Sequence, residues 1–241
     1  MSPSSPEVIL ALNTADRDTA LKWVSLFAGE LRWFKVGLPL FFRYGPDILI
    51  DLRKEGVQKI FLDAKLHEIP SVMRLTVEAL QELPVDMLTV HLLAGHVAIE
   101  EALQGWQRTD RRPLFVGVTL LSSMDARALS SILPDPIPPR EWSLHLAYLA
   151  DRLRLDGVVA SGDVAVEIKE KLPHRILVVP GIRWEEQKAD DQRRILTPAE
   201  AASAGFEYLV VGRPLTHVAD PLRALQELKR QLQEASGGTA A

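Results

Sequence analysis

The segment from Phe61 to Pro70, FLDAKLHEIP, places charged side chains directly after the apolar run KIFL. A charge that leaves water is costly unless it is paired or used, so Asp63 and Lys65 form either a structural ion pair or part of a reactive site. Taken alone, such a pair is more often a surface ion pair. Side chains two residues apart on a strand point the same way, so both should project from one face.

Lys35 lies in a second apolar segment, WFKVG, near the end of a predicted strand. A lone lysine at a strand end is ordinarily a solvated side chain. Here Lys35, Asp63 and Lys65 are all expected at one mouth of the fold, and titratable groups gathered in this way favour a functional site over a surface ion pair.

Two further segments, VVPGIRW and VVGRPLT, combine glycine with arginine. Gly181 and Gly212 allow a ligand to approach the backbone closely, and Arg183 and Arg213 supply cations beside backbone N–H groups. The alternative is two turns with surface arginines. If the segments form a site, a phosphorylated small molecule is the natural ligand, because loops after the last two strands of barrel enzymes often hold phosphate.

Short apolar runs alternate with amphipathic stretches of helical period along the chain. The predicted strands are residues 8–12, 33–36, 59–65, 87–92, 114–120, 156–160, 176–180 and 208–212. The predicted helices are residues 16–28, a stretch ending at Leu52, 71–83, 97–104, a region ending near Arg154, 164–171, 198–204 and 221–233. Eight such units predict a parallel, eight-stranded (β/α)₈ TIM barrel of the α/β class. An open doubly wound sheet is the alternative, but no glycine-rich turn follows the first strand.

We expect one barrel domain over residues 1–241, with short disordered ends at about 1–6 and 236–241. In a barrel, the strand ends and the loops after them meet at one mouth, which should collect polar groups from six or so strands. His91, at the end of the fourth predicted strand, is interpreted as a hydrogen-bonded packing residue rather than a catalyst.

Composition narrows the possible partners. The chain has 241 residues, with 28 Lys and Arg against 32 Asp and Glu, and both signs are spread along it, so we expect neither nucleic-acid nor membrane binding. It has no cysteine, which excludes disulfides, thiolate metal sites and a cysteine nucleophile. No secretory leader or membrane-spanning stretch is evident, so a soluble cytoplasmic protein is expected.

The segments FKVG, LDAKLHEIP, PGIR with DDQRRILTPAEA, and VVGRPLT, in this order, resemble orotidine 5′-phosphate decarboxylase of the bacterial type, from about Val8 to Leu232. The resemblance implies a (β/α)₈ homodimer with shared active sites that uses no metal or cofactor and converts orotidine 5′-phosphate to UMP in pyrimidine biosynthesis.

The resemblance also implies roles for individual residues. Lys65 matches the lysine that protonates C6 of the pyrimidine, and Asp63 matches the carboxylate beside the substrate carboxylate. Lys35 matches the lysine that joins this charge network, and Glu68 the acid that serves the partner's site. The implied substrate-binding residues are Asn13, Ser122, Ser123, Arg183, Gln192, Gly212 and Arg213.

The chain departs from the usual motif at Asn13, Glu68, Ser71 and Val72, where the family usually has Asp, Asp, Asn and Thr. Asn13 can hydrogen-bond a ribose hydroxyl but cannot supply negative charge to Lys35. These departures keep a non-catalytic nucleotide-binding barrel as an alternative. A related metal-assisted sugar-phosphate decarboxylase or aldolase, and a Schiff-base role for Lys65, are the others.

Overall fold

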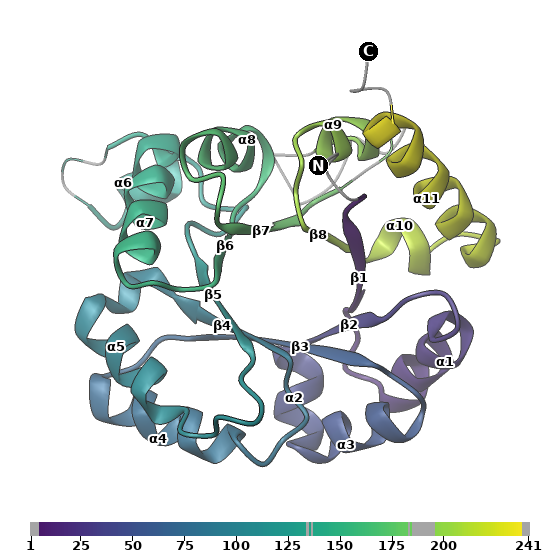
Figure 1. Ribbon diagram of the computed structural model, residues 1–241, viewed down its shortest axis with the longest axis horizontal. Helices are drawn as coiled ribbons and strands as arrows, with labels where there is room; N and C mark the ends of the chain where they lie inside the picture. Colours follow the sequence, from purple (N-terminus) through teal and green to yellow (C-terminus); the bar gives the residue numbers. More distant parts are fainter. Residues whose placement is uncertain (1–4, 134, 136, 183, 185–195, 238–241) are drawn as a thin grey trace.

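In the computed structural model, which describes residues 5–133, 135, 137–182, 184 and 196–237, eight parallel strands close into a barrel in the order β1 to β8 (Figure 1). The strands are β1 (Glu7–Leu12), β2 (Trp33–Gly37), β3 (Lys59–Leu66), β4 (Met87–His91), β5 (Leu114–Val118), β6 (Gly157–Val159), β7 (Ile176–Pro180) and β8 (Tyr208–Val211). The prediction of a (β/α)₈ barrel is confirmed.

Helices surround the barrel on its outside (Figure 1). They are α1 (Arg17–Phe27), α2 (Leu38–Tyr44), α3 (Asp47–Lys54), α4 (Pro70–Leu80), η1 (Leu92–Ala94), α5 (His96–Gly105), α6 (Ala126–Ser130), α7 (Pro139–Arg152), α8 (Gly162–Lys171), α9 (Pro198–Ser203), α10 (Arg213–Thr216) and α11 (Pro221–Gly237). No helix in the described part of the chain is long and apolar enough to cross a membrane.

Two helical regions that the sequence pattern predicted as continuous are each divided in two. The stretch ending at Leu52 is broken at Gly45, which has a φ of 61°, and at Pro46, which has no N–H to continue the helix. The region ending near Arg154 is α6 followed by α7, which begins at Pro139. Apolar periodicity survives such a break, so periodicity alone did not reveal it.

The core has an inner and an outer shell because side chains alternate along each strand. The inner shell fills the barrel with Ile9, Ala11, Trp33, Phe61, Met87, Val116, Val178 and Val210. The outer shell lies between the strands and the helices. The barrel is therefore packed below its mouth, and a ligand has room only where the inner shell ends.

Acidic residues placed directly before three strands close the opposite end of the barrel. Each accepts the backbone N–H of the second residue of the preceding strand, and each also pairs with a lysine or arginine. The pairs are Asp86 with Ile60, Asp156 with Phe115, and Glu207 with Leu177. These contacts satisfy strand-end donors far from the mouth, so they contribute to stability rather than to the site.

Candidate active site

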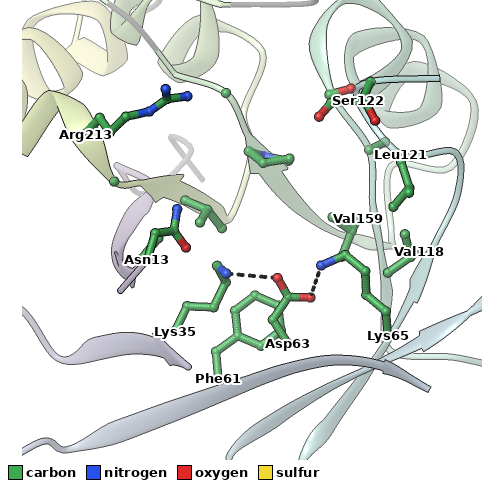
Figure 2. A pocket seen from close by; sticks show the side chains of 18 of the residues that line it. Asn13, Lys35, Phe61, Asp63, Lys65, Val118, Leu121, Ser122, Val159 and Arg213 are labelled. Atoms are coloured by element: carbon green, nitrogen blue, oxygen red, sulfur yellow. Dashed lines mark hydrogen bonds and ion pairs between the residues drawn. The ribbon is translucent and has the colours of Figure 1, made fainter. Parts of the chain in front are cut away.

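A cavity of about 530 Å³ opens at the carboxyl ends of the strands (Figure 2). Nine of the residues predicted from the sequence line it: Asn13, Lys35, Asp63, Lys65, Ser122, Ser123, Gly181, Gly212 and Arg213. They come from β2 and β3, from the loops after β1, β5, β7 and β8, and from the start of α10. Its size suits a small molecule.

Two lysines bind opposite oxygens of one buried carboxylate in this cavity. Lys35 Nζ lies 2.9 Å from Asp63 Oδ2, and Lys65 Nζ lies 2.8 Å from Asp63 Oδ1 (Figure 2). Lys35 and Asp63 are each only 9% exposed. Burial raises the pKa of Asp63, but the charges of Lys35 and Lys65 outweigh it and hold that pKa below its usual value. The aspartate is therefore ionised, and the cluster carries two positive charges and one negative charge.

The backbone that carries Asp63 and Lys65 is irregular. Leu62 pairs with Leu88 and Leu66 with Val90, so three residues of β3 face a single residue of β4, Thr89. Lys65 has a φ of 46°, a left-handed conformation that costs a residue with a Cβ roughly 1 to 2 kcal/mol. Asp63 and Lys65 do meet, as expected, but through this bulge and not through regular strand alternation.

Thr89 is a site residue that the sequence reasoning missed. Its Oγ1 accepts the backbone N–H of Lys65 at 2.7 Å, and its hydroxyl donates to Asp63 Oδ1 at 3.2 Å. The only sequence signal is a single hydroxyl inside the apolar run of β4. Such a hydroxyl needs buried partners, and here they are both parts of the charged cluster.

His91 is buried and hydrogen-bonded, as predicted. Its Nδ1 accepts the N–H of Leu93 at 3.3 Å, and its ring stacks on that of His67 with the centroids 5.5 Å apart. Burial, and then the neighbouring His67 and Lys65, lower the pKa of His91 to about 4. His91 is therefore neutral near pH 7.

The turn after β8 approaches the loop after β1 closely. A Cβ added at Gly212 would lie 3.3 Å from Asn13 Nδ2, so the glycine lets this amide lie against the backbone. Arg213 follows at the same side of the cavity (Figure 2). Ser161 and His217 also line the cavity and were not predicted from the sequence, because each is a single polar residue without a recognisable motif.

Not every predicted site residue is found in the cavity. Glu68 is exposed, and its Oε2 accepts the N–H of Ile69, so it does not line the pocket of its own chain. Arg183 and Gln192 lie outside the described residues. Among the described residues, no three His, Asp or Glu side chains come together as a metal site.

Comparison with known proteins gives one family. Residues 6–228 match the family model described as "Orotidine 5'-phosphate decarboxylase / HUMPS family". A protein of Pseudomonas fluorescens (strain SBW25) named orotidine 5′-phosphate decarboxylase is 41% identical over 235 residues, covering 96% of this chain and 100% of the relative. A protein of Tolumonas auensis with the same name is 39% identical over 232 residues, or 95% and 99% of the two chains.

Solved structures agree with this result. The crystal structure of orotidine 5′-phosphate decarboxylase from Lactobacillus acidophilus has a TM-score of 0.81 at 30% identity, over 94% of this chain and 99% of that chain. The enzyme from Methanocaldococcus jannaschii complexed with the inhibitor BMP has a TM-score of 0.76 at 22% identity, over 95% and 99% of the two chains, and shows the shared fold.

Proposed function

The chain belongs to the orotidine 5′-phosphate decarboxylase / HUMPS family, and on this basis we propose that it removes the carboxylate of orotidine 5′-phosphate to form UMP in pyrimidine biosynthesis. It is a carboxy-lyase. The observation that carries the proposal is the buried carboxylate of Asp63 held between the ammonium groups of Lys35 and Lys65 inside a cavity of substrate size.

The chemistry follows from this charge arrangement. The bond between C6 and the carboxylate breaks, carbon dioxide leaves, and the electron pair stays on C6. The ammonium of Lys65 then donates a proton to C6 and becomes a neutral amine. Fixed ammonium charges favour the carbanion that forms at C6, and they need no reorganisation because Asp63 already holds them.

Asp63 has a second effect on the reaction. A substrate carboxylate placed beside Asp63 would meet a like charge at close range, and that repulsion disappears once carbon dioxide leaves. Asp63 therefore penalises the bound substrate more than the transition state. Its low pKa supports this role, because only an ionised carboxylate repels.

The rest of the cavity would bind the parts of the substrate that do not react. In the proposed pose Arg213 and the backbone at Gly212 bind the phosphate, Asn13 and Lys35 contact the ribose, and Ser122 and Ser123 lie near the pyrimidine. All of these residues line the cavity. Contacts far from C6 supply binding energy that can be realised in the transition state. Arg183 and Gln192 complete the phosphate set on sequence grounds alone.

We also propose that the enzyme is a homodimer in which Glu68 serves the active site of the partner. Glu68 is exposed, and exposed apolar side chains follow it: Ile69 at 61%, Val72 at 37% and Leu75 at 62%. Leu93 and Val97, on the neighbouring η1 and α5, are also exposed. A group of exposed apolar side chains beside this exposed acid suits a second copy of this chain.

The test is the ultraviolet absorbance of orotidine 5′-phosphate over time with purified, EDTA-treated protein. Lys65→Met should abolish conversion to UMP. Lys59→Met is the matched control, because Lys59 lies on the same strand but pairs with Asp86 at the far end of the barrel. UMP formation by the wild type and the control alone supports the proposal.

Other outcomes point to the remaining functions. Binding of UMP without turnover by the wild type would indicate a nucleotide-binding barrel without activity. Activity lost on EDTA treatment and restored by a divalent cation would indicate the metal-assisted alternative. Trapping of substrate on Lys65 by borohydride would indicate a Schiff base.

A further inference from the structure

Thr89 closes a ring of hydrogen bonds around one end of Asp63. The backbone N–H of Lys65 donates to Thr89 Oγ1, the Thr89 hydroxyl donates to Asp63 Oδ1, and the same oxygen accepts from Lys65 Nζ at 2.8 Å. Thr89 has no exposed surface. The ammonium of Lys65 thus binds Asp63 Oδ1 directly, and the backbone N–H of Lys65 is connected to the same oxygen through the Thr89 hydroxyl.

The contact matters first for the carboxylate. Asp63 Oδ2 is bound by Lys35 and Oδ1 by Lys65 and Thr89. Lys65 is the group expected to lose a proton and move towards substrate, so its bond to Oδ1 is the one that weakens during a turnover. Thr89 cannot move with Lys65, because it is buried in β4. Its hydrogen bond therefore keeps the Asp63 carboxylate in place while Lys65 transfers its proton.

The contact matters equally for the backbone of Lys65. Three residues of β3 face Thr89 alone, so regular strand pairing does not fix the backbone of Lys65. The left-handed backbone conformation of Lys65 is itself unfavourable. A strained conformation persists only where its surroundings determine it. The Thr89 hydroxyl is the group that accepts the freed N–H, and it does so over the short distance of 2.7 Å.

We propose that Thr89 is a positioning residue of the reaction, whose hydroxyl holds the Asp63 carboxylate and the bulged backbone of Lys65 in the arrangement that proton transfer requires. The proposal rests on the proposed decarboxylase function. Thr89 acts through Asp63 and Lys65 and does not line the cavity in the described part of the chain.

A buried threonine can also have a purely structural role. Thr119, at the end of the neighbouring strand β5, is a residue with which Thr89 can be compared. Thr119 is likewise buried, and its hydroxyl donates to the backbone carbonyl of Val159 at 3.0 Å. Thr119→Val and Thr89→Val therefore remove the same group from equally buried positions, but only Thr89→Val removes a contact to the charged cluster. Thr89→Ser keeps the hydroxyl and tests whether that group is the active part.

The experiment compares kcat, KM and the pH profile of kcat for the wild type and these three variants. For Thr89→Val we expect kcat to fall about 100-fold with KM changed little, as for a reacting group misplaced by about 1 Å. The acid limb of its profile should move to higher pH, because a carboxylate that loses a donor is easier to protonate. Thr89→Ser should recover most of kcat and the wild-type acid limb, and Thr119→Val should leave that limb unchanged.

A second measurement does not need turnover. In the ligand-free protein, the Asp63 carboxyl followed by ¹³C NMR should titrate at higher pH in Thr89→Val, and the Lys65 amide should exchange its hydrogen faster. If the wild type is inactive but these changes appear, the proposed function fails and the positioning inference about the cluster stands. If the wild type is active and Thr89→Val behaves like Thr119→Val in both measurements, the inference is overturned.

Discussion

Lys35 and Lys65 bind different oxygens of the same carboxylate, at 2.9 Å and 2.8 Å, although they come from different strands. With Asp63 ionised, the cluster carries two positive charges and one negative, a net charge of +1. This excess of positive charge at the cavity favours an anionic ligand as a whole, and the proposed substrate is one. Asp63 still repels the substrate carboxylate locally, and that repulsion is relieved when carbon dioxide leaves.

Replacing the shared carboxylate should affect both catalysis and stability. We expect Asp63→Asn to lower kcat by at least about 100-fold, because Lys65 loses the partner that orients it. The two lysines also lose a buried partner, which should cost about 3 kcal/mol of unfolding free energy. Steady-state kinetics and urea unfolding measure the two effects. An unchanged free energy of unfolding would show that the ion pairs of Asp63 with Lys35 and Lys65 are solvated in solution.

The lowered pKa of His91 should make the free energy of unfolding fall as the pH becomes acidic. Its pKa is about 4 in the folded chain and near 6.5 in the unfolded chain, so between these values the unfolded state binds more protons. The contribution of His91 to stability is complete above pH 6.5 and declines as the pH falls towards 4. At 1.36 kcal/mol per pH unit, the loss from this group between pH 7.5 and 5 is about 2 kcal/mol.

The check is to measure urea unfolding at both pH values for the wild type and His91→Gln. The variant should lose about 2 kcal/mol less than the wild type over this interval. His96→Gln is the control, because His96 is exposed. The same pH dependence in His91→Gln and the wild type would contradict the assignment.

Gly212 should tolerate no side chain without a loss of substrate binding. A Cβ would lie 3.3 Å from Asn13 Nδ2 and would displace that amide from the cavity wall. We expect Gly212→Ala to raise KM about tenfold, with a smaller change in kcat. Gly29→Ala, where a Cβ has no neighbour within 4 Å, should leave KM unchanged.

Shared active sites predict complementation between two inactive chains. In a dimer of one Lys65→Ala chain and one Glu68→Ala chain, one site has both residues intact and the other has neither. If half the dimers in a random mixture are mixed, about a quarter of wild-type activity should return. Each variant alone should stay inactive. Absence of recovery in verified mixed dimers would count against shared active sites.

The sequence by itself determined the architecture and the main members of the cluster. Apolar runs such as VILAL and ILVVP alternate with amphipathic stretches, and eight such units leave few arrangements other than a closed parallel barrel. In that fold the strand ends meet at one mouth, so the position of Lys35, Asp63 and Gly212 in the chain was enough to bring them together.

The tertiary structure decided how these residues are held. The bulge of β3 against Thr89, the left-handed backbone of Lys65 and the stacking of His67 on His91 depend on the register between strands that are far apart in the chain. Local periodicity carries no information about that register, because it records only which face of one strand is buried. The break at Gly45 and Pro46 is different, because it is a local signal that periodicity alone does not register, and Ser161 and His217 are single residues without a motif.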